Sequence, residues 1–169
     1  MKNFLVLGLA LLLIGCGPED MQKIQITPNN WATRVADMDG LDSLEHGKSY
    51  LSVYSQIYSF SQLKKYNLTG MISLHNTSES DTLYLIKVHY YDTEGNMIRS
   101  YFEDPVFLSP METVEIVINQ DDISGGTGSN FIIEWKIPKG SPIPLFEGVM
   151  NSMQGTQGIS FTTQAHRIQ

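Results

Sequence analysis

Residues 130–137 read NFIIEWKI, and this stretch decides the fold. Every second residue from 131 to 137 is a large apolar side chain, and the charged Glu134 and Lys136 stand between them. A period of two is typical of a β-strand with one buried face, whereas an amphipathic helix would repeat its apolar positions every three or four residues. The stretch therefore predicts a strand with Phe131, Ile133 and Trp135 in the core.

The same alternation returns along the chain, and turn-forming residues separate the repeats. Residues 77–81 (TSESD) and 92–96 (DTEGN) are such turns, and Gly95 suits a bulged hairpin. A short strand is expected at Val106–Leu108, while residues 143–155 could form a strand or a short helix. We predict an all-β, antiparallel β-sandwich of immunoglobulin-like type with about seven to eight strands. The alternating segments are YLSVYSQIY (50–58), LTGMISLHN (68–76), LYLIKVHYY (83–91), VEIVI (114–118) and GISFTT (158–163).

In the strand expected at residues 83–91, the alternation predicts which side chains lie on each face of the sheet. In residues 83–91, strict alternation places Tyr84, Ile86, Val88 and Tyr90 on one side of the sheet, with Lys87 on the other. We therefore expect the first four side chains to face the core together.

The N-terminus has the layout of a secretory signal. Lys2 precedes an apolar run over residues 4–14, which is shorter than the ~20 residues of a membrane-spanning helix. The run ends in LIGC, which resembles a bacterial lipobox and makes Cys16 the expected lipidation site, carrying palmitate or similar chains. Two or three acyl chains anchor a protein stably to a membrane.

This layout suggests three parts: a signal peptide over residues 1–15, a lipidated tether over 16–47 and a β-sandwich over 48–169. Part of the tether, such as residues 31–35, could pack on the domain. Gly17 differs from the aspartate that retains some lipoproteins at the inner membrane. Glu19 and Asp20 resemble the acidic signal of some surface lipoproteins. We expect an envelope location at the outer membrane, on its periplasmic face or at the cell surface.

Composition excludes several functions. Cys16 is the only cysteine, so an internal disulfide, a second catalytic thiol and a cysteine-based zinc site are excluded in the mature chain. The net charge of −7 disfavours nucleic-acid binding, because phosphates would be repelled. Lys64 and Lys65 are the only adjacent pair of positive charges.

Several of these segments, taken in order, resemble a known family. They are YLSVYSQIY, LTGMISLHNTS, VHYYDTEGNMIRSY, LSPMETVEIVI, SGGTGSNFIIEW and GTQGISF. Over residues 50–163 they resemble the bacterial family catalogued as domain of unknown function 3124. The resemblance implies a secreted or lipid-anchored β domain and no particular activity. YYDTEGN and LSPMET also resemble short immunoglobulin-like domains of bacterial envelope proteins, at the level of fold alone.

Residues 121–131 (DDISGGTGSNF) look most like a site. A phosphate-binding loop would lead into a helix, but strands are expected on both sides, and the acidic side chains would repel phosphate. Oxygens of Asp121, Asp122 and Asn130 could bind calcium, although an EF-hand pattern is absent. An inter-strand loop without metal or cofactor is the favoured interpretation, with calcium as the alternative.

Neither histidines nor carboxylates form a recognisable catalytic set. If residues 77–81 joined two paired strands, His75 would lie opposite Leu83 and His89 opposite Thr69, too far apart to share a zinc ion. No G-x-S-x-G motif occurs, and carboxylates such as Glu134 fall on outward faces or turns. We expect no catalytic residues, and a hydrolase is the least favoured alternative.

An aromatic strip is the most suggestive surface feature. Tyr50, Tyr54 and Tyr58 share the face opposite Leu51 and Val53. Tyrosine provides a large contact area at low entropic cost, so the strip suits recognition of a protein or glycan. Packing under the tether is the competing interpretation. We expect a membrane-anchored, non-enzymatic binding or assembly module, or alternatively a carbohydrate- or ligand-binding module assisted by calcium.

Overall fold

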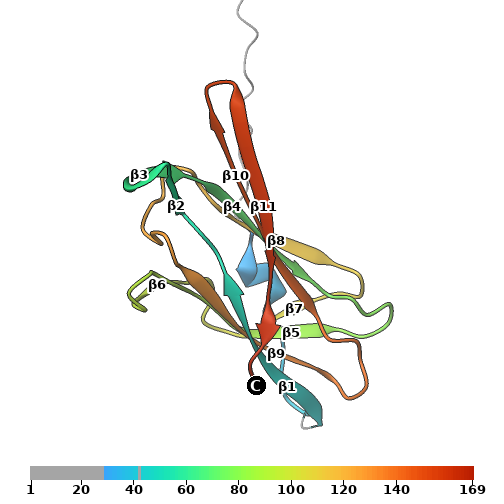
Figure 1. The fold of residues 1–169 in the computed structure, drawn as a ribbon. Helices are drawn as coiled ribbons and strands as arrows, with labels where there is room; N and C mark the ends of the chain where they lie inside the picture. Colours follow the sequence, from blue (N-terminus) through green and yellow to red (C-terminus); the bar gives the residue numbers. More distant parts are fainter. Residues whose placement is uncertain (1–28, 42) are drawn as a thin grey trace, which may run out of the picture.

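The computed structural model describes residues 29–41 and 43–169 (Figure 1). A short 3-10 helix, η2 (Trp31–Arg34), is followed by antiparallel strands, and the described residues contain no α-helix. Within them, no helix has the length and apolar character needed to cross a membrane. The strands are β1 (Leu44–Ser52), β2 (Gln56–Ser59), β3 (Ser61–Asn67), β4 (Thr69–His75), β5 (Leu83–Tyr91), β6 (Met97–Ser100), β7 (Val106–Leu108), β8 (Thr113–Ile118), β9 (Asn130–Pro138), β10 (Leu145–Gln154), β11 (Gln157–Gln164) and β12 (His166–Arg167).

Two antiparallel sheets pack face to face, which confirms the predicted sandwich. One sheet has the order β12-β1-β9-β5-β6, with β7 also paired to β5, and the other has the order β11-β10-β4-β8. Strands β2 and β3 form a separate hairpin that projects from one end of the sandwich (Figure 1). The ambiguous residues 143–155 are mostly strand β10.

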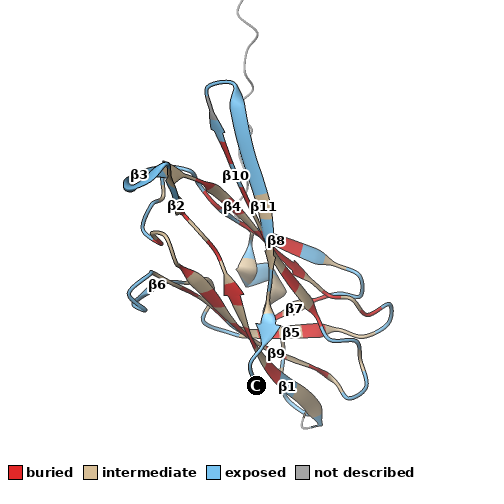
Figure 2. Ribbon diagram, in the orientation of Figure 1, coloured by how far each residue is buried: buried red, intermediate tan, exposed pale blue. Residues whose placement is uncertain are grey.

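The core lies between the two sheets, where buried residues alternate with half-buried or exposed ones along strands such as β8 and β9 (Figure 2). Strand β9 is its centre, because it pairs with both β1 and β5 and buries Phe131, Ile133 and Trp135 completely. Tyr90 stacks on Phe131 with ring centroids 4.8 Å apart. The alternation predicted for NFIIEWKI is therefore confirmed.

Strand β5 departs from strict alternation. Its pairing with β9 shifts register between Leu85 and Lys87, so Ile86 is an extra residue in a β-bulge. The bulge reverses the faces of the first half of the strand: Leu83 and Leu85 are fully buried together with Val88 and Tyr90. The expectation that Tyr84 and Ile86 face the core is wrong, because a single bulge moves every side chain before it to the other face.

The turn at residues 77–81 crosses between the sheets instead of closing a hairpin. Strand β4 pairs with β8 and β10, whereas β5 lies in the other sheet. His75 therefore lies opposite Thr113 and Leu145, not Leu83, and His89 lies opposite Ile132 and not Thr69. The conditional placement of His75 opposite Leu83 and of His89 opposite Thr69 is wrong, because the sequence pattern does not reveal which strands are neighbours. In contrast, residues 92–96 do close the β5–β6 hairpin, with Gly95 at φ 87°.

The segment before β1 packs against the sandwich. Val35 forms an isolated β-bridge with Val106, and the Ala36 amide donates to the Pro105 carbonyl at 2.8 Å. Trp31 packs on Phe102 with ring centroids 5.2 Å apart. Residues 31–35 thus pack on the domain, as the sequence allowed, and β1 begins at position 44, within the stretch assigned to the tether.

Candidate functional site

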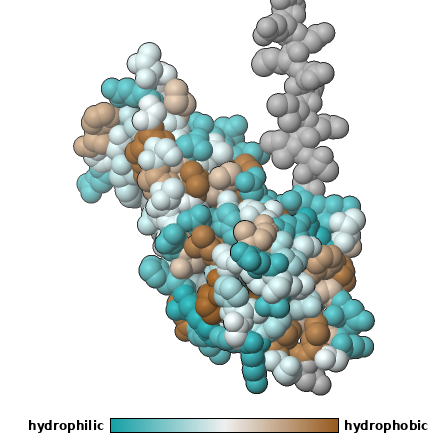
Figure 3. Space-filling view, turned by 90° about the vertical axis from the view of Figure 1, so that its right-hand side faces the viewer, coloured by the Kyte–Doolittle hydropathy of each residue, from teal (hydrophilic) through white to brown (hydrophobic). Residues whose placement is uncertain are grey.

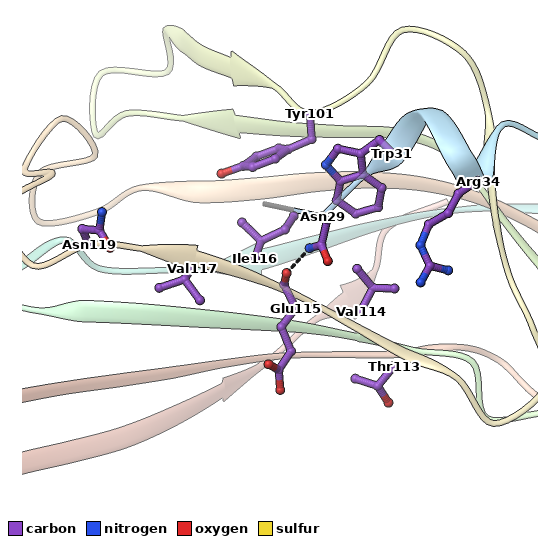
Figure 4. Close-up of a pocket in the computed structure, with 10 residues that line it drawn as sticks. All are labelled: Asn29, Trp31, Arg34, Tyr101, Thr113, Val114, Glu115, Ile116, Val117 and Asn119. Atoms are coloured by element: carbon purple, nitrogen blue, oxygen red, sulfur yellow. Dashed lines mark hydrogen bonds between the residues drawn. The ribbon is translucent and has the colours of Figure 1, made fainter. Parts of the chain in front are cut away.

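A cleft of about 600 Å³ opens beside β8, at the edge of the four-stranded sheet (Figure 4). Strand β8 forms one side, with Val114, Ile116 and Val117 among the lining residues. Trp31 from η2 and Tyr101, which follows β6, form the facing wall. The cleft is therefore built from an edge strand and two aromatic side chains that are brought to it from elsewhere in the chain.

The free side of β8 carries main-chain hydrogen-bonding groups. Within the described part of the chain, β8 pairs with β4 alone. In an antiparallel strand, successive residues direct their N–H and C=O groups to opposite sides. Because the Glu115 carbonyl is directed into the cleft, the main-chain groups of Thr113 and Val117 face the same way. Such a row is a template for another extended segment.

Asn29 already occupies one position of this template. Its side-chain amide donates a hydrogen bond to the Glu115 carbonyl (Figure 4). A neighbouring strand would place a main-chain N–H at the same acceptor. One side-chain amide thus takes the place of a strand donor, while the rest of the edge lines the open cleft.

The aromatic wall is held from behind. Tyr101 stacks on Phe131 with ring centroids 5.7 Å apart, and Arg99 donates to its hydroxyl at 3.5 Å. Burial raises the pKa of Tyr101 above its ordinary value of 10.0, although Arg99 opposes the shift. The ring is therefore neutral at physiological pH, and both its packing and its hydrogen bond limit its movement.

An ion pair fixes η2 beside the cleft. Arg34 Nη2 lies 2.7 Å from Glu112 Oε1, and Glu112 also accepts the Ser109 N–H at 2.8 Å. The bond from Arg34 is the main cause that lowers the pKa of Glu112 below its ordinary value of 4.5, against the opposing effect of burial. Glu112 is therefore charged at neutral pH, and the pair ties the C-terminal residue of η2, the element that begins with Trp31, to the turn before β8.

Chemically, this arrangement suits the binding of an extended backbone. It offers main-chain donors and acceptors, aromatic surface and one charged pair. Among residues 29–41 and 43–169, no three His, Cys, Asp or Glu side chains are grouped to hold a metal ion.

The three predicted binding tyrosines do not share one strand. Tyr50 lies in β1 opposite Ile132, whereas Tyr58 lies in β2 and is 54% exposed. Tyr54 falls between these strands and packs on Phe161 with centroids 5.9 Å apart. The chain leaves one sheet after Ser52 and enters the β2–β3 hairpin, so the structure separates the tyrosines into three surroundings. Their role in binding stays a prediction.

The glycine-rich loop connects β8 to β9, as predicted, and supports the place where β1 gives way to β2. The Gly126 carbonyl accepts the main-chain N–H groups of Ser55 and Gln56 at 3.1 and 3.0 Å. A side chain at Gly125 would collide with the Tyr90 hydroxyl, so glycine is required by this close approach.

The candidate calcium ligands of this loop have separate surroundings. Asp122 forms an ion pair with Arg99 at 3.0 Å and accepts from Ser124. Burial is the largest single effect on the pKa of Asp122 and raises it, but the hydrogen bonds from Ser124 and Arg99 together bring it below its ordinary value. Asp121 is exposed, and Asn130 begins β9 opposite Ser52. Calcium binding at these residues stays a prediction. Cys16, Glu19 and Asp20 lie outside the described residues.

The comparisons with known proteins place the sandwich in a family. A family model described as "Protein of unknown function (DUF3124)" matches residues 46–168. The chain belongs to this family. The DUF3124 match begins inside β1 and ends after β12, so it covers both sheets, while Asn29, Trp31 and Arg34 lie before it. The family resemblance found in the sequence is confirmed.

Two further comparisons complete this picture of the DUF3124 chain. No curated protein matches it. Among solved structures, the crystal structure of Thermotoga maritima 1070 is similar, with a TM-score of 0.46 and 11% sequence identity, over 71% of this chain and 92% of that chain.

Sequence reasoning missed most of the cleft. Tyr101 follows a predicted strand without a distinguishing pattern, and the free edge of β8 is a property of strand order. The useful signal was Trp31, a large aromatic residue in a segment rich in Pro and Asn, where a solvent-exposed tether would need none.

Proposed function

We propose that this protein is a lipid-anchored, non-enzymatic module of the bacterial envelope that binds an extended segment of a partner protein along β8. The observation that best supports this proposal is the free edge of β8, which opens into a cleft with an aromatic wall. Strand addition of this kind derives affinity from main-chain hydrogen bonds and specificity from pockets for alternate side chains.

The residues at the cleft fit this mode of binding. Thr113, Glu115 and Val117 present main-chain groups, as Asn29 demonstrates at one of them. Trp31 and Tyr101 offer the aromatic surface that is enriched at protein interfaces. Val117 is 42% exposed, an apolar contact available to an incoming strand.

The anchor supports an envelope location. The lipobox-like LIGC places Cys16 where acylation would attach the chain to a membrane. In cells fed labelled palmitate, the wild-type chain should carry the label and sediment with membranes, while Cys16→Ala should do neither. A labelled Cys16→Ala chain would contradict the assignment of the anchor.

Site-specific photo-crosslinking tests the binding proposal. A photoreactive amino acid replaces Val117 in the cleft or, as a matched control, the exposed Thr162 on β11 at the other edge of the same sheet. In native membranes, position 117 should give one discrete adduct whose mass spectrum maps to a short partner segment. Trp31→Ala should weaken that adduct.

Several results would contradict the proposal. Among them are equal adducts from both positions, an adduct that is insensitive to Trp31→Ala, and no adduct from position 117. A crosslink from position 117 to the same chain would show that the edge is filled internally and would also overturn it.

A further inference from the structure

The β2–β3 hairpin exposes three large apolar or aromatic side chains to solvent. Phe60, at the tip, is 89% exposed, and Leu63 is 91% exposed. Tyr58, on the preceding strand, is 54% exposed. Soluble surfaces rarely gather apolar residues in this way unless the surface contacts something.

The tip is also conformationally unfavourable for the residue it holds. Phe60 has φ 62°, in the left-handed region where a bulky side chain is an outlier and glycine or asparagine would be easier. A turn optimised for folding alone would not place phenylalanine there. Strain of this kind is found at sites where function requires the side chain.

Two lysines accompany the exposed rings. Lys64 Nζ lies 5.3 Å from the centroid of Phe60 and 5.4 Å from that of Tyr66, and Lys65 Nζ lies 5.2 Å from the centroid of Tyr58. The hairpin thus carries rings with an ammonium group beside them. Apolar tips flanked by lysines match the boundary between the acyl chains and the headgroups of a bilayer.

The end of the sandwich that carries the β2–β3 hairpin lacks the acidic character of the whole chain. The chain has net charge −7, yet residues 46–78 and 148–169 contain no Asp or Glu. These ranges include the β2–β3 hairpin and the whole of β11, which forms a second hairpin with β10. The β2–β3 and β10–β11 hairpins lie at the same end of the molecule (Figure 1). Met153, in the second hairpin, is 68% exposed. The space-filling view shows hydrophobic residues among hydrophilic ones at this end of the molecule (Figure 3).

We infer that the β2–β3 hairpin is a membrane-docking element that inserts Phe60 and Leu63 at the surface of a bilayer with anionic headgroups, while Lys64 and Lys65 contact those headgroups. The anionic surface is chosen because the lysines are the adjacent positive pair of an acidic chain and no carboxylate stands near them in sequence. This inference is independent of the β8 cleft and of the residue that carries the anchor.

Depth-resolved fluorescence tests the inference. The full chain is reconstituted in phosphatidylcholine vesicles with or without phosphatidylglycerol, with an environment-sensitive fluorescent amino acid at position 63. The matched control carries the same amino acid at Met111, which is 65% exposed in the β7–β8 connection and is adjacent in sequence to Glu112. Position 63 should shift to the blue and be quenched by lipid-phase nitroxides when phosphatidylglycerol is present, while position 111 should stay accessible to iodide in water.

A double lysine variant measures how much the positive charges contribute to insertion. Replacing both, Lys64→Gln with Lys65→Gln, should lower the ratio of inserted to free hairpin about twenty-five-fold, from roughly fivefold per lysine near an anionic surface. Near-ultraviolet circular dichroism should stay unchanged, because the tip lies outside the core. Iodide access to position 63 in both vesicle types would overturn the inference, as would equal burial of position 111. A blue shift that requires native envelope proteins instead of lipid would assign the hairpin to a protein partner and would also overturn it.

Discussion

Among single residues, Gly47 illustrates how tightly the core limits the sequence. It lies in β1 opposite Trp135, whose ring is fully buried and donates to Ser49 Oγ at 2.9 Å. A Cβ at position 47 would collide with the Trp135 ring. Gly47→Ala should therefore lower the free energy of unfolding by about 1–3 kcal/mol, the usual effect of overpacking.

Denaturant unfolding monitored by tryptophan fluorescence measures this loss. The matched control is Gly70→Ala in β4, where the nearest atom to a new Cβ is Val53 Cγ1 at 3.6 Å, an ordinary contact. That variant should unfold close to the wild type. Equal losses at both positions would show that strand glycines matter for their flexibility rather than for the approach of Trp135.

The Glu112 carboxylate makes the free energy of unfolding depend on pH. Its pKa is lowered in the folded chain, so it stabilises the fold above its unfolded value of about 4.5, and the contribution is lost as pH falls through the folded value. At pH 7, Glu112→Gln should cost about 0.2–1 kcal/mol of unfolding free energy, the range for a partly exposed pair. The difference in unfolding free energy between this variant and the wild type should disappear as pH falls below 4.5. Thermal unfolding across pH measures it, and Glu103→Gln at an exposed position is the control. A gap that persists in acid would contradict the role of charge.

At the scale of elements, β5 marks the boundary between what sequence can and cannot predict. Residues 83–91 were recognisable as a strand, as were Val106–Leu108 and the bulged turn at Gly95, because alternation and turn chemistry are local. The bulge at Ile86 was not recognisable. Four apolar residues in a row, from Leu83 to Ile86, fit either register, and pairing with β9 selects one of them.

This register has a direct consequence for mutation. Leu85→Ala should lower the free energy of unfolding by about 2–5 kcal/mol, because it leaves a cavity beside fully buried neighbours. Ile86→Ala, at a half-buried position in the bulge, should cost about 1 kcal/mol or less. Chemical denaturation of the two variants compares them directly. A larger loss of unfolding free energy for Ile86→Ala than for Leu85→Ala would contradict the bulge and favour the register in which Ile86 faces the core.

At the scale of the whole molecule, the sandwich was predictable and the cleft was not. Period-two patterning determines that two apolar sheet faces must bury each other, which is enough for the fold class. The cleft depends on strand order, which leaves β8 at an edge, and on η2 returning from before β1 to place Trp31 beside Tyr101. Contacts between segments so far apart in sequence leave no local pattern.

The central claim is that the outward main-chain groups of β8 receive another strand in the envelope. Amide hydrogen exchange tests it most directly, by comparing the chain in native membranes with the chain purified in detergent. The amides of Glu115 and Val117 should exchange slowly in native membranes and rapidly after purification, while those of Val114 and Ile116, directed to β4, should stay slow in both. Rapid exchange of Glu115 and Val117 in both settings would contradict the claim.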